Sequence, residues 1–255
     1  MYTHLRWHST FSFLEGIGKI DDILAKTEEL NMNAICLAEY YYMAWAIQFY
    51  QKAIKKWIKP IIGVELWYTT DIQLIPHDFI PWNLVIIAKN FRWYQNILSL
   101  VTDAHKNKIH NKPTIDNAIL QEFTSDIYLL CWWIHSFLAQ DILAKKDETS
   151  VAEKRQWFQK TFGKENVLLD IIVQNYTQIP EYKIVNNTIK KIASQNSTPL
   201  LINNDFRYTN ETDKESHEVW LAIKDGRKIN DPYRRNIARI RKKLITNRIC
   251  TKMYR

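Results

Sequence analysis

The chain has 255 residues, of which 46% are hydrophobic and 24% are charged, and this globular composition excludes a fibrous or wholly disordered protein. The length suits one α/β barrel, which commonly uses about 250 residues. An apolar run of about 18 residues and an apolar signal core are both missing, so we expect neither membrane contact nor secretion. Three widely spaced cysteines without a CxxC pair fit free thiols, and therefore a cytoplasmic protein.

The formal net charge of +8 is concentrated near the C-terminus. Residues 233–255 contain nine arginines and lysines and no acid, and subtracting these nine leaves about −1 for residues 1–232. We therefore expect a folded domain over residues 1–232 and a divergent basic tail over residues 233–255. Such a tail fits contact with nucleic-acid phosphates or the solvated remnant of a longer chain, and its few aromatic residues favour the remnant.

Strand-like and helix-like segments alternate along the chain. In chain order we predict a strand at 2–8, a helix at 19–30, a strand at 34–38, a helix at 43–56, strands at 61–66 and 83–88, a helix at 91–105, a strand at 127–131, a helix at 151–162, a strand at 167–172, a helix at 180–196 and a strand at 200–202. This alternation indicates βαβ units, a parallel sheet of about seven strands and an α/β fold, with a barrel favoured over an open sheet.

Polar residues stand at the ends of several predicted strands, where parallel barrels carry their chemistry. Among them His8, Glu65 and Asp205 are candidate ligands for a divalent metal ion. Each also has a structural interpretation: a hydrogen-bonded histidine for His8, a paired buried carboxylate for Glu65, and a turn or helix cap for Asp205.

Two motifs near the N-terminus resemble a known family. His4-Leu-Arg-Trp-His-Ser9, followed by Phe11-Ser-Phe-Leu-Glu-Gly16, is similar to the sequences His-Leu-His-Val-His-Ser and Tyr-Ser-Leu-Leu-Asp-Gly, which open the PHP domain of bacterial polymerase III alpha subunits. The resemblance implies a distorted (β/α)7 TIM-like barrel, the PHP fold, over residues 1–232. It continues through residues 30–34, 46–50, 58–65, 84–90, 112–116, 204–205, 216–219 and 228–232.

The resemblance also implies a metal cluster, since intact members hold up to three metal ions and some hydrolyse phosphoesters. The family ligands kept in this chain are His8, Glu15, Glu65 and Asp205. The positions at which a family ligand is replaced are Arg6, Tyr40, Asn83, Trp133 and Arg207. Because arginine keeps its proton and repels cations, we expect the two arginines to form ion pairs with Glu65 or Asp205 in the space of the metals. Mg, Mn or Zn would bind only at a residual site.

The function implied by the resemblance is that of a PHP module in a replicative DNA polymerase. The complete protein would be a DNA-directed DNA polymerase, a nucleotidyltransferase, whereas this part alone would be structural, with little or no 3′–5′ exonuclease activity. Its partners would be the rest of the alpha chain and, through the complete protein, DNA and replisome subunits. A free-standing PHP phosphoesterase is the alternative, and a basic nucleic-acid-binding protein would depend on the tail alone.

Glycine and tryptophan occur in unusual proportion. The chain has 5 Gly and 10 Trp, whereas average usage predicts roughly 18 Gly. Tryptophan stands where the family has glycine, although glycine there serves turns that need positive φ. We hypothesise that the codon UGA means glycine in the source and was translated as tryptophan; genuine enrichment in tryptophan is the alternative. The positions concerned are Trp45, Trp57, Trp93, Trp132 and Trp133.

Overall fold

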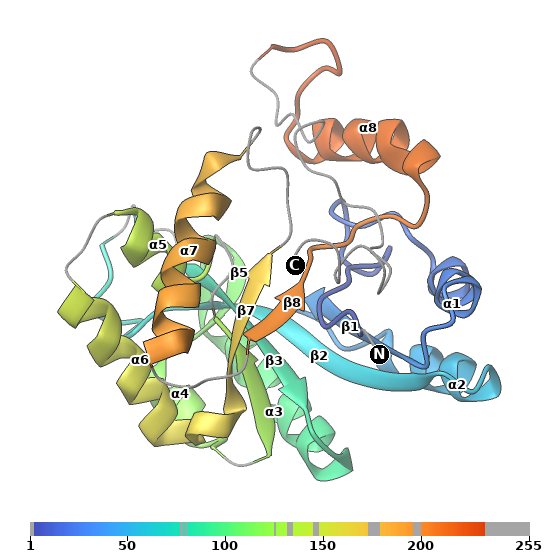
Figure 1. The fold of residues 1–255 in the computed structure, drawn as a ribbon. Helices are drawn as coiled ribbons and strands as arrows, with labels where there is room; N and C mark the ends of the chain where they lie inside the picture. Colours follow the sequence, from blue (N-terminus) through green and yellow to red (C-terminus); the bar gives the residue numbers. More distant parts are fainter. Residues whose placement is uncertain are drawn as a thin grey trace. The chain divides into compact units, whose positions relative to one another are not determined.

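The computed structural model describes residues 3–76, 79, 81–124, 126–131, 135–144, 148–172, 179–195 and 200–232. These residues form two compact units (Figure 1). The first unit runs to Ile62 and resumes from Ile202, and it also takes in Ile179. The second consists of Gly63–Ile172 and Pro180–Leu201. The predicted basic tail, residues 233–255, lies outside the described residues.

In the described part of the first unit there are three α-helices and one complete strand. Helix α1 (Ile20–Glu29) and helix α2 (Ala46–Lys55) flank β1 (Ala34–Tyr40), and α8 (Lys214–Lys224) follows a 3-10 turn at Glu211–Asp213. The α1 sequence has the expected helical spacing, because Ile20, Ile23, Leu24 and Thr27 are buried on one face. β1 pairs with β2 (Lys59–Tyr68), which begins in this unit and continues into the second.

All three of these helices end in the same hydrogen-bonded turn, with one residue in the left-handed region. At the end of α2, Trp57 N–H donates to Ile54 O and Ile58 N–H donates to Ala53 O, both at 3.0 Å. This is the Schellman pattern, whose left-handed residue is usually glycine. The left-handed residues are Asn31 after α1, with φ 52°, Trp57 after α2, with φ 56°, and Gly226 after α8, with φ 61°.

The tryptophans of the codon hypothesis differ in burial and in backbone conformation. Trp57 is 93% exposed, so no packing compensates for its backbone conformation. Trp45, by contrast, has φ −79°, is fully buried and donates its indole N–H to Tyr42 O. Trp93 is also buried, within a helix. The structure therefore favours glycine at position 57 and not at 45 or 93; positions 132 and 133 lie outside the described residues.

The predicted strand at 2–8 is wrong over the described residues 3–8. Trp7 makes a single parallel bridge with Phe206 instead of a ladder. His4 O accepts from Cys36 N–H and Trp7 O accepts from Ala38 N–H. These two bonds are three residues apart on this segment but only two residues apart on β1, so the segment contains one extra residue. Such a bulge interrupts regular pairing. Four consecutive residues of this segment, Arg6 to Ser9, are fully buried.

The second unit is a mixed sheet with helices packed on it. The sheet order is β4-β5-β2-β3-β6-β7-β8. Helix α3 packs on β3 and β5, whereas α6 and α7 pack on β7 and against α5 (Figure 1). The strands are β3 (Trp82–Ala88), β4 (Lys108–Ile109), β5 (Lys112–Ile115), β6 (Ile127–Leu130), β7 (Val167–Ile172) and the start of β8 (Leu200–Asn203), whose last two residues belong to the first unit. The helices are α3 (Phe91–Lys106), α4 (Asn117–Gln121), α5 (Phe137–Leu143), α6 (Glu148–Phe162), a 3-10 turn at Lys164–Asn166 and α7 (Pro180–Gln195).

The predicted α/β class is confirmed, although the strand pairing is mixed. β2 pairs with β5, and β6 with β7, in parallel, whereas β3 runs antiparallel to both β2 and β6. No helix forms between β2 and β3 in the described residues, so the chain returns beside β2 in the opposite direction. The order is consistent with a distorted barrel, but the sheet is not closed within the described residues. Among these residues, no helix is long and apolar enough to cross a membrane.

Candidate functional site

Arg207 and Asp205, which follow β8, form a paired unit inside the first compact unit. Arg207 Nε donates to Asp205 Oδ1 at 2.8 Å, and Nη2 donates to Oδ2 at 3.1 Å. This two-pronged geometry is the strongest form of an arginine–carboxylate pair. The Arg207 side chain is only 4% exposed and that of Asp205 only 8%, so water screens the pair poorly.

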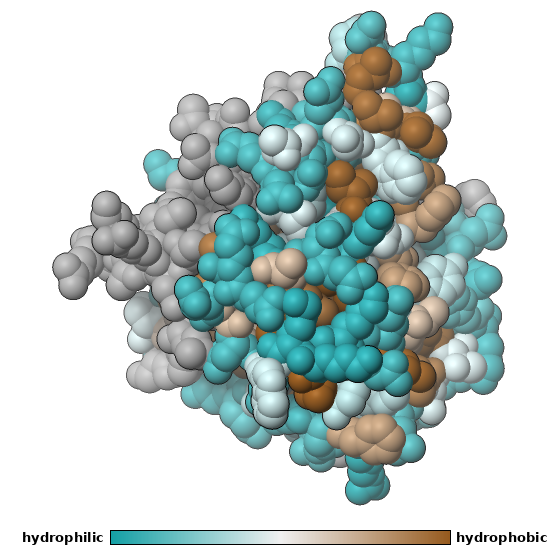
Figure 2. All heavy atoms as spheres, turned by 90° about the vertical axis from the view of Figure 1, so that its right-hand side faces the viewer, coloured by the Kyte–Doolittle hydropathy of each residue, from teal (hydrophilic) through white to brown (hydrophobic). Residues whose placement is uncertain are grey.

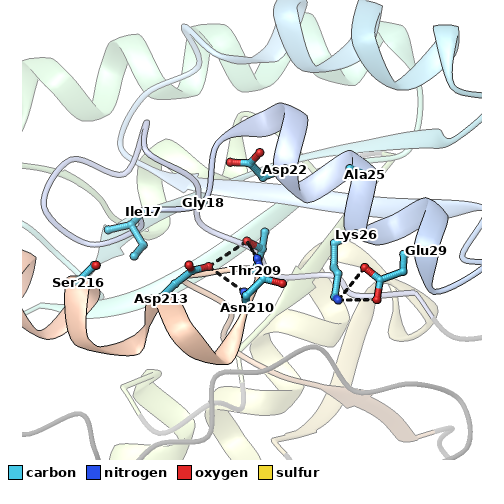
Figure 3. Close-up of a pocket in the computed structure, with 10 residues that line it drawn as sticks. All are labelled: Ile17, Gly18, Asp22, Ala25, Lys26, Glu29, Thr209, Asn210, Asp213 and Ser216. Carbon is cyan, nitrogen blue, oxygen red and sulfur yellow. Dashed lines mark hydrogen bonds and ion pairs between the residues drawn. The ribbon is translucent and has the colours of Figure 1, made fainter.

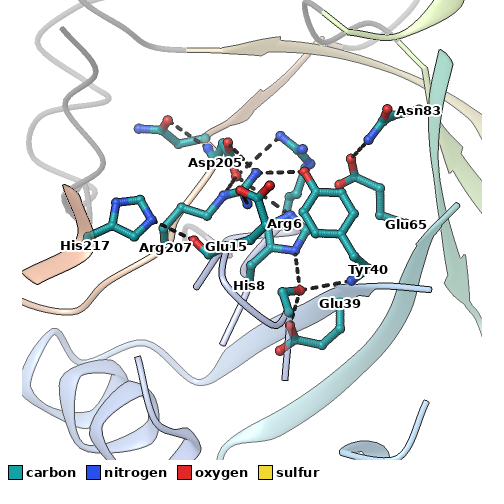
Figure 4. Close-up of polar contacts among 12 residues, drawn as sticks. Arg6, His8, Glu15, Glu39, Tyr40, Glu65, Asn83, Asp205, Arg207 and His217 are labelled. Carbon is teal, nitrogen blue, oxygen red and sulfur yellow. Dashed lines mark hydrogen bonds and ion pairs between the residues drawn. The ribbon is translucent and has the colours of Figure 1, made fainter. Parts of the chain in front are cut away.

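The same guanidinium binds two further groups (Figure 4). Arg207 Nη1 donates to Glu15 Oε2 at 3.0 Å and Nη2 donates to the Tyr40 hydroxyl at 2.8 Å. Glu15 is also paired with Lys224 of α8. On the other side of Asp205, Arg6 Nη1 lies 3.6 Å and His8 Nε2 lies 3.7 Å from Oδ1. We call this set the Arg207 cluster: Arg6, His8, Glu15, Tyr40, Asp205, Arg207 and Lys224.

Charge pairing fixes the protonation of Arg207. Burial lowers the pKa of the guanidinium, but the charges of Asp205, Tyr40 and Glu15 and the hydrogen bond to Asp205 outweigh it. The net result is a pKa well above the ordinary arginine value. Arg207 is therefore a permanent internal cation.

His8 belongs to a second hydrogen-bonded group next to this cation. Its ring stacks on Tyr40 with centroids 4.3 Å apart, and Nδ1 lies 3.1 Å from Ser12 Oγ. Ser12 Oγ donates to Glu39 Oε2 at 2.5 Å and accepts from Tyr40 N–H. While Glu39 is ionised, the single Ser12 proton goes to Glu39, so Nδ1 of His8 must be the donor to Ser12.

Glu39 is fully buried at the end of β1. Ser9 N–H donates to both of its carboxylate oxygens, at 2.8 and 3.0 Å. Burial raises the pKa of Glu39, and the hydrogen bonds from Ser12 and Ser9 and the charge of Arg207 only partly offset this rise. Glu39 therefore favours its protonated form more than an exposed glutamate does.

The second unit holds the two remaining described candidates, Glu65 and Asn83. In the β2–β3 pairing Trp67 stands opposite Asn83, which places Glu65 diagonally across from Asn83. The Asn83 amide donates to Glu65 Oε1 (Figure 4). Glu65 is buried, so this bond satisfies a carboxylate that would otherwise be costly. The candidate Trp133 lies outside the described residues.

The described residues do not fit a metal cluster. Asp205 and Glu15 each accept a hydrogen bond from the Arg207 guanidinium, a cation that repels metal ions. No group of three His, Cys, Asp or Glu side chains in the described part of the chain is arranged to hold a metal ion. Of the two partners predicted for Arg6 and Arg207, Glu65 or Asp205, Asp205 forms an ion pair with both arginines.

A polar pocket of about 490 Å³ lies in the first unit, beside α1 and the start of α8 (Figure 3). Five of its polar residues bind one another: Asp213 accepts from Thr209 and Asn210, and Lys26 is paired with Glu29. Asp213 and Lys26 are therefore engaged within the fold rather than placed as a catalytic acid–base pair.

The family model for the PHP domain matches residues 4–173. The chain belongs to the PHP domain family. Its relatives include DNA polymerase III subunit alpha of Borreliella burgdorferi, 30% identical over 237 residues, and that of Thermus aquaticus, 30% identical over 240 residues. Both matches cover 91% of this chain but only 20% and 19% of the relatives. The PHP domain thus spans about a fifth of the length of these relatives.

Solved structures give weaker likenesses to this PHP domain. An amidohydrolase from Chromobacterium violaceum has a TM-score of 0.43 at 10% identity, covering 82% of this chain and 88% of that one. A putative metal-dependent phosphoesterase from Bifidobacterium adolescentis has a TM-score of 0.31 at 13% identity, covering 64% of this chain and 48% of that one.

Sequence reasoning missed several partners in this PHP domain. Lys224 pairs with Glu15 across 209 positions, and His217 Nε2 contacts Glu15 O at 2.6 Å. Ser12 joins His8 to Glu39. The motif at 216–219 includes His217 and was the one signal that pointed to this segment. It did not reveal the partner of His217.

Proposed function

We propose that this PHP domain is a structural module of a bacterial replicative DNA polymerase, the polymerase III alpha subunit, without phosphoesterase chemistry of its own. The observation that carries the proposal is the bidentate pair between Arg207 and Asp205, extended to Glu15. The alpha-subunit relatives support the assignment to a polymerase.

The chemistry of phosphoester hydrolysis explains why this pair argues against activity. Metal-dependent hydrolysis needs anionic or imidazole ligands that hold metal ions, generate hydroxide and clamp the phosphate. In this chain the Asp205 and Glu15 carboxylates already neutralise a fixed guanidinium. The module therefore lacks 3′–5′ exonuclease activity.

In this proposal the module works through the complete polymerase. DNA synthesis, a nucleotidyl transfer, belongs to a polymerase body outside the part that matches this chain. Contacts with DNA and replisome subunits are made by the complete protein, in the cytoplasm. The role of the PHP module is to support that body.

Metal content and hydrolysis together test the loss of phosphoesterase chemistry. The purified 255-residue chain is incubated with Mn²⁺ or Zn²⁺, desalted and analysed for bound metal, and it is assayed on p-nitrophenyl phosphate and on the 3′ end of single-stranded DNA. We expect no tightly held metal and no turnover above the metal alone. Two or more tightly held ions with turnover would instead identify a free-standing PHP phosphoesterase.

The genomic sequence tests the polymerase assignment separately. With UGA translated as glycine, the DNA of the source should encode a polymerase body, either downstream of codon 255 or as another gene. A genome whose replicative polymerase already has a complete PHP domain of its own would contradict the proposal.

A further inference from the structure

The outward side of α8 carries an exposed apolar surface. Val219 is 42% exposed and Ile223 is 58% exposed, one turn apart on the helix. Phe13, from the loop before α1, is 74% exposed, and its ring lies 6.4 Å from that of Trp220, edge to face. Figure 2 shows hydrophobic side chains interspersed with hydrophilic ones toward the top of this face of the molecule. We call Phe13, Val219, Trp220 and Ile223 the α8 face.

The inward side of α8 is buried and bonded to the rest of the first unit, which holds the helix in place. His217 and Leu221 are each 1% exposed, four positions apart. The His217 ring contacts Glu15 O, and Lys224 pairs with the Glu15 carboxylate, which is in turn held by Arg207. A helix with one anchored apolar side and one exposed apolar side is unusual for a domain that functions alone.

The position of α8 in the family comparison indicates what covers the α8 face. The PHP family model ends at residue 173, before α8 begins. The Borreliella burgdorferi relative matches 91% of the chain, and the unmatched remainder is shorter than the segment after Lys224, so the match includes α8. Helix α8 thus lies within the match to this polymerase subunit but beyond the range of the PHP family model. About four fifths of that relative lies beyond the match.

We propose that the α8 face docks the polymerase body, the polypeptide that makes up the rest of an alpha subunit. This inference rests on the proposed function. The chemistry of the face suits a protein partner, because buried interface centres are apolar and rich in aromatic residues, with tryptophan prominent among the residues that contribute most. The half-buried Trp220 ring lies edge to face with the exposed Phe13 ring and so adds aromatic surface to the face.

A binding experiment with matched variants tests the inference. The full 255-residue chain is titrated with the polymerase body encoded in the same genome, produced without its matching PHP segment, and the dissociation constant is measured by calorimetry. Ile223→Glu places a charge in the α8 face. Ile47→Glu is the control, since Ile47 is a 64% exposed isoleucine on α2 of the same unit. Circular dichroism and the thermal midpoint of each variant establish that it is folded.

The outcomes separate the inference from the proposed function. We expect Ile223→Glu to weaken binding at least about tenfold and Ile47→Glu to change it less than about twofold. Binding that Ile223→Glu leaves unchanged overturns the docking surface but leaves the proposed function intact. Failure of the unaltered chain to bind contradicts both. A self-association of the chain that Ile223→Glu abolishes makes a second copy the occupant and overturns the inference; if Ile223→Glu unfolds, Val219→Ser is read in its place.

Discussion

Arg207 turns back on Asp205, two positions earlier, and binds both oxygens of its carboxylate, at 2.8 and 3.1 Å. Its remaining nitrogen, Nη1, reaches Glu15 at 3.0 Å. One buried guanidinium thus joins two carboxylates that the family resemblance identifies as metal ligands. Removing this cation would leave both acids in a site with little water to solvate them.

Arg207→Met should therefore destabilise the PHP domain strongly. Breaking a buried ion pair by removing one partner costs about 3 to 5 kcal/mol, and Arg6 and Lys224 still compensate part of the negative charge. We expect a loss of roughly 3 kcal/mol in the free energy of unfolding, measured by urea denaturation.

An exposed arginine pair provides the comparison for this measurement. Arg227 pairs with Asp231 at 3.2 Å, and its side chain is 52% exposed. Because exposed ion pairs contribute little, Arg227→Met should cost less than about 1 kcal/mol. Equal losses for Arg207→Met and Arg227→Met would show that the Arg207 cluster does not stabilise the fold.

Restoring two histidines should recover metal affinity. The resemblance places histidine at positions 6 and 207, so the double variant Arg6→His with Arg207→His removes two cations and adds two imidazole ligands beside His8, Glu15 and Asp205. Second-shell changes alone alter metal affinity about 10- to 100-fold. We expect the double variant to bind Mn²⁺ or Zn²⁺ at least about tenfold more tightly than the unaltered chain in calorimetric titration.

The pH dependence and a surface control identify the site of that binding. Imidazole binds metal only when neutral, so the affinity gained should fall below about pH 6.5. Arg92→His with Arg227→His places two histidines at exposed positions and should bind no better than the unaltered chain. Equal gains in both double variants would point to nonspecific histidine binding.

The sequence predicted regular elements well where apolar spacing was strong. The helix predicted at 19–30 is α1, and the strand predicted at 167–172 is β7 with identical bounds. Helix α8 was missed, because its buried side includes a histidine and its exposed side is apolar, which blurs the helical pattern. The prediction of a parallel sheet was only partly right, because the spacing of apolar residues does not reveal that β3 runs antiparallel to its neighbours.

Local ion pairs could be predicted in the site, whereas long-range partners could not. The resemblance placed Arg207 in the space of the metals, where its charge suggested an ion pair with Glu65 or Asp205, and Asp205 is the partner. Glu15 and Lys224 meet only because α8 packs on the loop before α1, and spacing in the sequence carries no trace of that packing.

Trp57→Gly should stabilise the domain. Trp57 occupies the left-handed position of the turn after α2, with φ 56°, and a residue with a Cβ loses about 1 to 2 kcal/mol there. Glycine relieves this strain but adds freedom to the unfolded chain, worth about 0.4 to 1 kcal/mol. We expect a net gain of about 0.5 to 1 kcal/mol in urea denaturation.

Trp45→Gly should have the opposite effect, because Trp45 is fully buried and has φ −79°. We expect this substitution to lower the free energy of unfolding by about 3 kcal/mol or more.

Mass spectrometry of the protein from its source tests the codon hypothesis directly. Glycine at position 57 would support it. Tryptophan at position 57 would refute it for this turn, whatever the engineered variants show.

Glu39 should make stability depend on pH in the direction opposite to a salt-bridged carboxylate. Burial raises its pKa in the folded state, so folding favours the protonated form. Its contribution is then fully present below the unfolded pKa and is lost as pH rises through the folded pKa. Glu39→Gln removes this titration and keeps an oxygen that accepts from Ser9 N–H. As the pH rises from about 4.3, the ordinary glutamate pKa, the variant should therefore become more stable relative to the unaltered chain until the folded pKa of Glu39 is passed.

Urea denaturation across that pH range measures the difference in the free energy of unfolding. Glu29→Gln is the control, because the Glu29 side chain is 64% exposed and forms an ion pair with Lys26. Its curve should run parallel to that of the unaltered chain. The opposite result would be that the unaltered chain becomes more stable relative to Glu39→Gln as pH rises. In that case the hydrogen bonds from Ser9 and Ser12 and the charge of Arg207 outweigh the effect of burial on the pKa of Glu39. Glu39 would then be an ionised acceptor held by those three residues, and His8 would donate to Ser12 throughout the range.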